Sequence, residues 1–182
     1  MEFIKTEIEG LTLVKPRVFE DDRGHFFESY NQESMKEGDI NCNFIQDNQS
    51  YSCYGTIRGM HLQTGEYAQS KLVRVIKGAV LDVVADVRPQ STTFGKWFSV
   101  KLTDSNYQQL FIPKGMAHGF AVLSQDAIFQ YKVDNYYHQL SESGFKFDDP
   151  ELNIDWLLPI NERITSSKDQ KLPSFSDFRN SL

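Results

Sequence analysis

The segment from residue 70 to residue 135 constrains the fold more than any other part of the chain, because it contains only short apolar stretches separated by turn signals. In the stretch 79–88, Leu81, Val83 and Ala85 occupy every second position, as in a β-strand. Similar stretches follow at residues 94–102, 109–112, 119–123 and 127–133. A parallel sheet would need crossover helices, and this segment has no room for them. The sequence therefore predicts an all-β sandwich or barrel.

The whole chain of 182 residues reads as one domain, since it contains no internal repeat, low-complexity tract or flexible linker. A chain of this length buries about 70% of its unfolded surface and needs no disulfide or metal to fold. Two short peripheral helices are expected. One lies near residues 32–37, and the other starts near Ser166, where Asp169 three positions later suits the first turn of a helix.

Composition excludes several classes of protein. The 25 acidic and 19 basic side chains give a net charge of −6, which argues against a nucleic-acid-binding protein. Two cysteines are too few for a disulfide framework. No apolar run approaches about 18 residues, and the first residues do not resemble a signal peptide, so we expect a cytoplasmic protein without a membrane partner. Aromatic residues make up 13% of the chain, which favours β-structure and pockets that stack flat ligands.

Nucleotide-cofactor and hydrolase motifs are absent: the chain has no GxxxxGK[ST], GxGxxG or GxSxG. A metal site could draw on His61 and His118, but two imidazoles alone make a poor set of ligands. Without a metal, two interpretations of His61 remain: a structural histidine on a strand whose hydrogen bonds are satisfied, or a general base. Arg58, Lys71 and Arg74 give it a positively charged neighbourhood.

Several segments favour the second reading when they are taken together. They are residues 22–28, 46–50, 55–63, 69–75, 94–97, 112–120 and 148–150. Over roughly residues 11–173, in order and with few gaps, they resemble the dTDP-4-dehydrorhamnose 3,5-epimerase family of metal-free cupins. The resemblance implies a jelly-roll barrel, also called a double-stranded β-helix, that works as a homodimer with no metal or cofactor. It also implies a reaction, inversion of C3 and C5 of a dTDP-linked 4-keto-6-deoxyglucose on the route to dTDP-L-rhamnose.

The resemblance assigns four catalytic roles, and the residue types suit them. His61 matches the base, since the pKa of an imidazole ordinarily lies near neutral pH. Asp169 matches the carboxylate that orients this base. Lys71 matches the cation that stabilises the enolate oxygen, and Tyr131 matches the acid on the opposite face of the sugar. The structural alternatives are a helix N-terminal acid for Asp169, a solvated lysine and a core tyrosine.

Further residues match binding positions of the family. Arg23 and Arg58 match residues that hold the diphosphate, and guanidinium groups suit that task. Phe26 could stack on the thymine. The polar positions around nucleotide and sugar correspond to Glu28, Gln46 and Asn48. The resemblance also implies that an N-terminal segment, about residues 1–30, contributes to the partner subunit.

The remaining assignments are less specific. His118 is expected to orient the sugar, with Asp82 as its cross-strand partner. Tyr137 is expected to line the pocket, although Tyr136 competes with it. The sequence differs from the residues that are common in the family at positions 49, 60, 62 and 147, which carry Gln, Met, Leu and Phe. These departures leave open whether one or both carbons are inverted, which sugar is processed and which nucleotide base it carries.

Four alternatives stay open at this point. The nearest is a mono-epimerase acting at C3 or C5 only, and a 3,4-ketoisomerase is a further relative. A non-catalytic jelly roll that binds sugar nucleotides would keep the arginines and the aromatic residues. A metal-dependent cupin oxygenase would need a stoichiometric metal.

Overall fold

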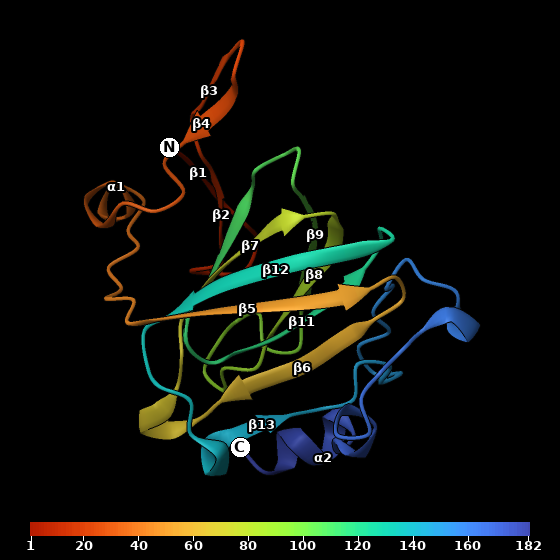
Figure 1. Ribbon diagram of the computed structural model, residues 1–182. Coiled ribbons are helices and arrows are strands. Elements are labelled where there is room, and N and C mark those ends of the chain that lie inside the picture. Colours follow the sequence, from red (N-terminus) through yellow and green to blue (C-terminus); the bar gives the residue numbers. More distant parts are fainter.

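Two antiparallel β-sheets face each other in the computed structural model, which describes residues 1–182 (Figure 1). The six-stranded sheet has the order β1 (Glu2–Lys5), β2 (Thr12–Lys15), β10 (Gln109–Ile112), β7 (Lys71–Lys77), β12 (Asp126–Val133) and β5 (Gln46–Cys53). The five-stranded sheet has the order β13 (Glu142–Gly144), β6 (Ile57–Gln63), β11 (Met116–Val122), β8 (Ala79–Asp86) and β9 (Trp97–Thr103). From β9 to β13 each strand belongs to the sheet opposite the one before it, so the chain forms a jelly roll, and the predicted all-β fold is confirmed.

Three apolar cores hold these layers together. The inter-sheet core includes Val73 of β7, Val84 of β8, and the stacked rings of Phe120 and Phe129. A second core, the C-terminal core, covers the other face of the five-stranded sheet with aromatic side chains of residues 145–178. A third cluster packs around Met35 against the outer face of the six-stranded sheet. Apolar burial on both sides of both sheets is what fixes this layered arrangement.

Strand β8 is buried along nearly its whole length, because it separates two of these cores. Leu81, Val83 and Ala85 pack into the C-terminal core, whereas Val80 and Val84 pack into the inter-sheet core. The alternation in the sequence had indicated a strand, and the second covered face comes from tertiary packing.

The first expected helix forms where the sequence places it. Helix α1 spans Gln32–Glu37, and the side chain of Asn31 caps it by accepting hydrogen bonds from the backbone N–H groups of Glu33 and Ser34. The second expectation is wrong in its position. Residues after Ser166 form only a 3₁₀ turn, η4 (Asp169–Lys171), and the α-helix α2 spans Phe175–Asn180.

Proline chemistry explains this difference. Pro173 disfavours helical conformation at the preceding residue, so a helix begun at Ser166 cannot continue. Ser174 then starts α2 by accepting a hydrogen bond from the N–H of Asp177. The remaining 3₁₀ turns are η1 (Gly65–Tyr67), η2 (Gln139–Ser141) and η3 (Ile160–Glu162). None of the helices is long and apolar enough to cross a membrane.

A β-hairpin of β3 (Val18–Asp21) and β4 (Gly24–Phe27) projects away from the two sheets (Figure 1). Its inner contacts are few: His25 and Phe27 pack on the ring of Tyr107. Phe19 and Phe26 are exposed, with 70% of Phe26 accessible to solvent. Exposed aromatic rings on a two-stranded hairpin are unusual for a surface that faces only water.

Candidate active site

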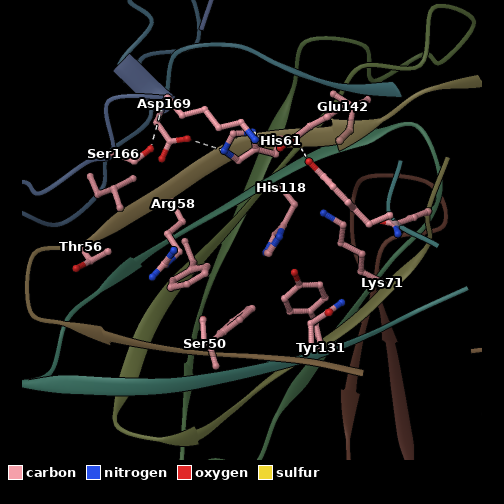
Figure 2. Close-up of a pocket in the computed structure, with 18 of the residues that line it drawn as sticks. Ser50, Thr56, Arg58, His61, Lys71, His118, Tyr131, Glu142, Ser166 and Asp169 are labelled. Carbon is pink, nitrogen blue, oxygen red and sulfur yellow. Dashed lines mark hydrogen bonds and ion pairs between the residues drawn. The ribbon is translucent and has the colours of Figure 1, made fainter. Parts of the chain in front are cut away.

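A cavity of about 680 Å³ opens between the two sheets, a size that suits a ligand of several rings. Its walls come from β5, β6, β7, β11 and β12 together with residues 164–169, and Figure 2 shows the side chains that point into it. The sequence-predicted residues that line it are Gln46, Asn48, Arg58, His61, Lys71, His118, Tyr131, Tyr137 and Asp169. Tyr136 does not line it.

His61 reaches the cavity because of the pleat of β6. Its neighbours Met60 and Leu62 pack into the C-terminal core, so His61 faces the opposite sheet. Gly59 has a φ of +131°, and a side chain there would meet the backbone of the adjacent strand β11. This close approach places His118 directly opposite His61 in the β6–β11 pairing.

The two nitrogens of His61 differ in their surroundings. Nε2 lies 2.7 Å from Oδ1 of Asp169, as the dashed line in Figure 2 marks. Nδ1 is buried without a hydrogen-bond partner, and the nearest charged group is the carboxylate of Glu142 at 3.8 Å. With Asp169 ionised, Nε2–H donates to it, and Nδ1 keeps a free lone pair. The arrangement is that of a base held in one tautomer.

Asp169 is fixed from two sides. The hydroxyl of Ser166 accepts a hydrogen bond from its backbone N–H at 3.0 Å, and His61 binds its carboxylate. Burial raises the pKa of Asp169, but the hydrogen bond from His61 and the attraction of Lys168 together lower it by more than burial raises it. The pKa of Asp169 therefore lies below its ordinary value. The carboxylate is therefore ionised at neutral pH.

Glu142 and Lys168 line the cavity although sequence reasoning did not single them out. Oε2 of Glu142 accepts hydrogen bonds from the hydroxyl of Tyr137 at 2.8 Å and from the Lys168 ammonium at 2.6 Å. Burial raises the pKa of Glu142, but these two donors lower it below the ordinary value. Strand β13 has only three residues, and it pairs with β6, which is distant in the sequence. No local sequence pattern therefore predicted that Glu142 lies at the cavity.

Lys71 and Tyr131 project from the six-stranded sheet toward His61 on the facing sheet (Figure 2). Desolvation lowers the pKa of Lys71 to about 8, and the negative charges of Asp82 and Glu142 keep it from falling further. Burial raises the pKa of Tyr131 above its ordinary value, so its hydroxyl keeps its proton at neutral pH. A base thus stands on one wall, and a cation and an acid stand on the other.

His118 forms a second histidine–carboxylate pair. Its Nε2 lies 2.9 Å from Oδ2 of Asp82, which is fully buried on the neighbouring strand β8. Burial raises the pKa of Asp82 above its ordinary value, although His118 and Lys71 oppose the shift. Each of the two histidines that line the cavity is therefore paired with its own carboxylate. No group of three or more His, Cys, Asp or Glu side chains is placed to hold a metal ion.

Polar side chains extend the cavity along β5 and β6. Gln46 donates a hydrogen bond to Asn48 at 2.9 Å, and Arg58 donates to the hydroxyl of Ser52 at 3.1 Å. Of the four positions that differ from the residues common in the family, Gln49 and Leu62 line the cavity. Three cations in the lining, Arg58, Lys71 and Lys168, outnumber its two carboxylates, Glu142 and Asp169, although the net charge of the chain is negative.

Three expected binding residues lie outside the cavity of their own chain. Arg23 is exposed in the β3–β4 turn, where it forms an ion pair with Asp21. Phe26 points to solvent on the same hairpin. Glu28 accepts hydrogen bonds from Asn31 and Ser34 at the start of α1. The structure therefore does not bring these residues to the pocket within one chain.

Comparison with known proteins agrees with this geometry. A family model described as dTDP-4-dehydrorhamnose 3,5-epimerase matches residues 5–177. The chain is 51% identical over 173 residues to the Escherichia coli (strain K12) dTDP-4-dehydrorhamnose 3,5-epimerase, covering 94% of this chain and 93% of that one. The crystal structure of the Elizabethkingia anophelis NUHP1 enzyme of the same description superposes with a TM-score of 0.94 at 47% identity, covering 97% of both chains. A Legionella pneumophila dTDP-6-deoxy-D-glucose-3,5-epimerase, solved with dTDP-4-keto-L-rhamnose, gives a TM-score of 0.92 at 42% identity, covering 96% of this chain and 93% of that one.

Proposed function

Because the chain belongs to the dTDP-4-dehydrorhamnose 3,5-epimerase family, we propose that it inverts C3 and C5 of a dTDP-linked 4-keto-6-deoxyglucose. The product is dTDP-4-keto-L-rhamnose, the precursor of dTDP-L-rhamnose. The observation that carries the proposal is the arrangement of an imidazole held by a carboxylate on one wall of the cavity and a protonated tyrosine on the facing wall. Epimerisation needs this arrangement, because the proton leaves one face of the ring and returns to the other.

His61 takes the proton from the carbon next to the C4 ketone. Its Nδ1 is the free nitrogen, and Asp169 on Nε2 stabilises the imidazolium that forms. The carboxylate of Glu142 at 3.8 Å adds a second negative charge near the protonated ring.

Lys71 stabilises the charge that develops on the ketone oxygen. With a pKa of about 8, its amine is mostly protonated at pH 7 and still close to the range where it gives up a proton. In a cavity with little water, such an ammonium lowers the energy of an enolate far more than it would in solvent.

Tyr131 returns a proton from the opposite face. Its raised pKa keeps the phenol protonated until a strongly basic carbon is presented to it. The two carbons that are inverted both lie next to the ketone. One base, one cation and one acid can therefore serve both after the ring is repositioned.

The nucleotide part is held by the polar end of the cavity. Arg58 binds the diphosphate, Gln46 and Asn48 bind the nucleotide, and Tyr137 provides an aromatic wall. His118, held by Asp82, orients the sugar. No cofactor takes part in these steps, since proton removal and return balance each other.

The protein acts as a homodimer in this proposal, and the β3–β4 hairpin of one protomer completes the pocket of the other. Support comes from the exposed Phe19 and Phe26 on a hairpin that projects from the sheets, and from the position of Arg23 outside its own cavity. Covering these rings would bury apolar surface, and the trans placement would bring Arg23 to a second phosphate. The cytoplasmic location expected from the sequence stays a prediction, which fractionation of source cells would test.

Incubation in D₂O with dTDP-4-keto-6-deoxyglucose tests the function directly. We expect one deuteron at C3 and one at C5 of the product by ¹H NMR, with no loss of rate after treatment with a chelator. A single deuterium position would identify a mono-epimerase. Tight binding without any exchange would identify a non-catalytic binding protein, and a rate that needs added metal would favour a metal-dependent enzyme.

A further inference from the structure

Gln63 is a buried polar residue that the reaction steps above do not use. It is the last residue of β6, two positions after His61, so both side chains face the cavity. We infer that Gln63 is a positioning residue that sets the conformation of residues 134–138, here named the rim loop, and thereby places Tyr137 at the pocket. The inference rests on the proposed function.

The amide of Gln63 uses both of its N–H groups and its oxygen. Nε2 donates to the carbonyl oxygens of Tyr136 at 3.1 Å and of Tyr67 at 2.7 Å. Oε1 accepts from the backbone N–H of His138 at 2.7 Å. The carbonyl of Tyr136 and the N–H of His138 belong to the two peptide groups that flank Tyr137. One side chain therefore fixes the backbone on both sides of this tyrosine.

The rim loop has further bonds to residues 66–70, so it is tied to that segment along its length. Asn135 donates to the carbonyl of Glu66 at 2.8 Å, and Gln69 donates to the carbonyl of Asn135 at 2.7 Å. The rings of Tyr67 and His138 stack with their centroids 3.9 Å apart. Gln63 differs from these contacts, because it alone reaches the peptide groups next to Tyr137 from the strand that carries the base.

The position of the rim loop matters for substrate binding because the loop carries Tyr137. Tyr137 lines the cavity and has 57% of its surface exposed, so packing alone does not hold its ring. Its hydroxyl donates to Glu142, which Lys168 also binds. If the backbone at Tyr137 is free to rotate, the aromatic wall is lost, but Lys168 still holds Glu142 near His61. Loss of Gln63 should therefore weaken substrate binding more than it slows proton transfer.

The experiment compares five variants with the wild-type dimer: Gln63→Met, Gln63→Glu, Tyr137→Ala, the double variant Gln63→Met with Tyr137→Ala, and the control Ser124→Ala. Met keeps the length of Gln but makes no hydrogen bonds. Ser124 bonds to backbone groups of Ala79 and Asp126, outside the cavity, so its variant reports the cost of losing side-chain-to-backbone bonds elsewhere. For each variant KM and kcat are measured by NMR-detected epimerisation, dTDP binding by calorimetry, and Tm by thermal unfolding.

We expect Gln63→Met to raise KM and the Kd for dTDP about tenfold and to change kcat less than about threefold. In the Tyr137→Ala background the same change should add less than about twofold, since the ring it places is gone. Ser124→Ala should lower Tm and leave KM unchanged. Gln63→Glu provides a second variant, because it keeps the acceptor for His138 and loses both donors, and it should raise KM as well.

Three results would overturn the inference: an unchanged KM in Gln63→Met, the full effect of Gln63→Met in the absence of Tyr137, or failure of both Gln63 variants to fold. The last result would make Gln63 a determinant of stability. Absence of turnover in the wild-type protein would contradict the proposed function instead, and the same assay reports it separately.

Discussion

Tyr131 is the residue whose proposed role separates epimerisation from simple proton exchange. In Tyr131→Phe, the hydrogen-bonded pair of His61 and Asp169 is intact, so the α-proton should still leave the substrate. Its return from the opposite face should fall by about 10²-fold or more, because the phenol is absent. We expect deuterium to accumulate in recovered substrate faster than in product, with one carbon affected more than the other. Equal loss of exchange in substrate and product would contradict an acid role for Tyr131.

The proposed role of Lys71 predicts that activity falls at alkaline pH. Its pKa is lowered to about 8, so the ammonium is present below this pH and is lost as the pH rises through it. We expect kcat/KM to decline above about pH 8 as the cation disappears. In Lys71→Arg the guanidinium stays charged, so whatever activity the variant keeps should not show this decline. A wild-type profile that is flat to pH 9.5 would exclude this role for Lys71.

The residues predicted for the cavity came from the resemblance to the epimerase family, and alternation along the strand supported Tyr131 alone. His61, Lys71 and Tyr131 do line the cavity. Glu142 and Lys168 were missed, because a three-residue strand and an irregular segment give no periodic signal.

At the scale of elements, the segment 164–171 shows how a local signal can be right while the element is wrong. Ser166 does accept a hydrogen bond from the N–H of Asp169, as a helix N-cap would. The helix itself does not follow, because Pro173 ends the run and Ser174 begins α2. The capping contact instead holds the partner of the base.

Ser166 and Ser174 form a matched pair for testing this difference. Each hydroxyl accepts a hydrogen bond from the N–H three residues later. Ser174→Ala should lower the free energy of unfolding by about 1 kcal/mol and leave kcat unchanged. Ser166→Ala should lower kcat about three- to tenfold, since Asp169 loses its backbone anchor. The measurements are thermal unfolding and initial rates, and equal effects of the two variants on kcat would refute the distinction.

For the whole molecule, alternation and turn signals were sufficient to predict an all-β sandwich or barrel, since short strands leave no room for crossover helices. The jelly roll within that class was implied by the resemblance to the epimerase family. The burial of the second face of β8 could not be predicted from the sequence pattern, because it depends on residues 145–178 packing against the sheet. Periodicity did not predict the hairpin of β3 and β4, whose exposed rings would be covered in the proposed dimer.

Mixed dimers would test that assembly. In a dimer of one Arg23→Ala and one His61→Ala chain, a trans hairpin gives one pocket with both residues intact. Random mixing of the two inactive variants should therefore restore about a quarter of wild-type activity. The readout is the epimerisation rate after subunit exchange, with sedimentation to confirm dimers. If no activity returns although mixed dimers form, Arg23 does not act on the partner's pocket.

Because His61 and Tyr131 stand on different sheets, the distance between their side chains depends on the packing of the core between the sheets. Facing sheets lie about 10 Å apart, a spacing set by the side chains between them. The stacked Phe120 and Phe129 belong both to this core and to the lining of the cavity. Substitutions that shrink them would change the reach between the two catalytic groups as well as stability. At Phe120 and Phe129, one substitution should therefore alter both the epimerisation rate and the thermal stability.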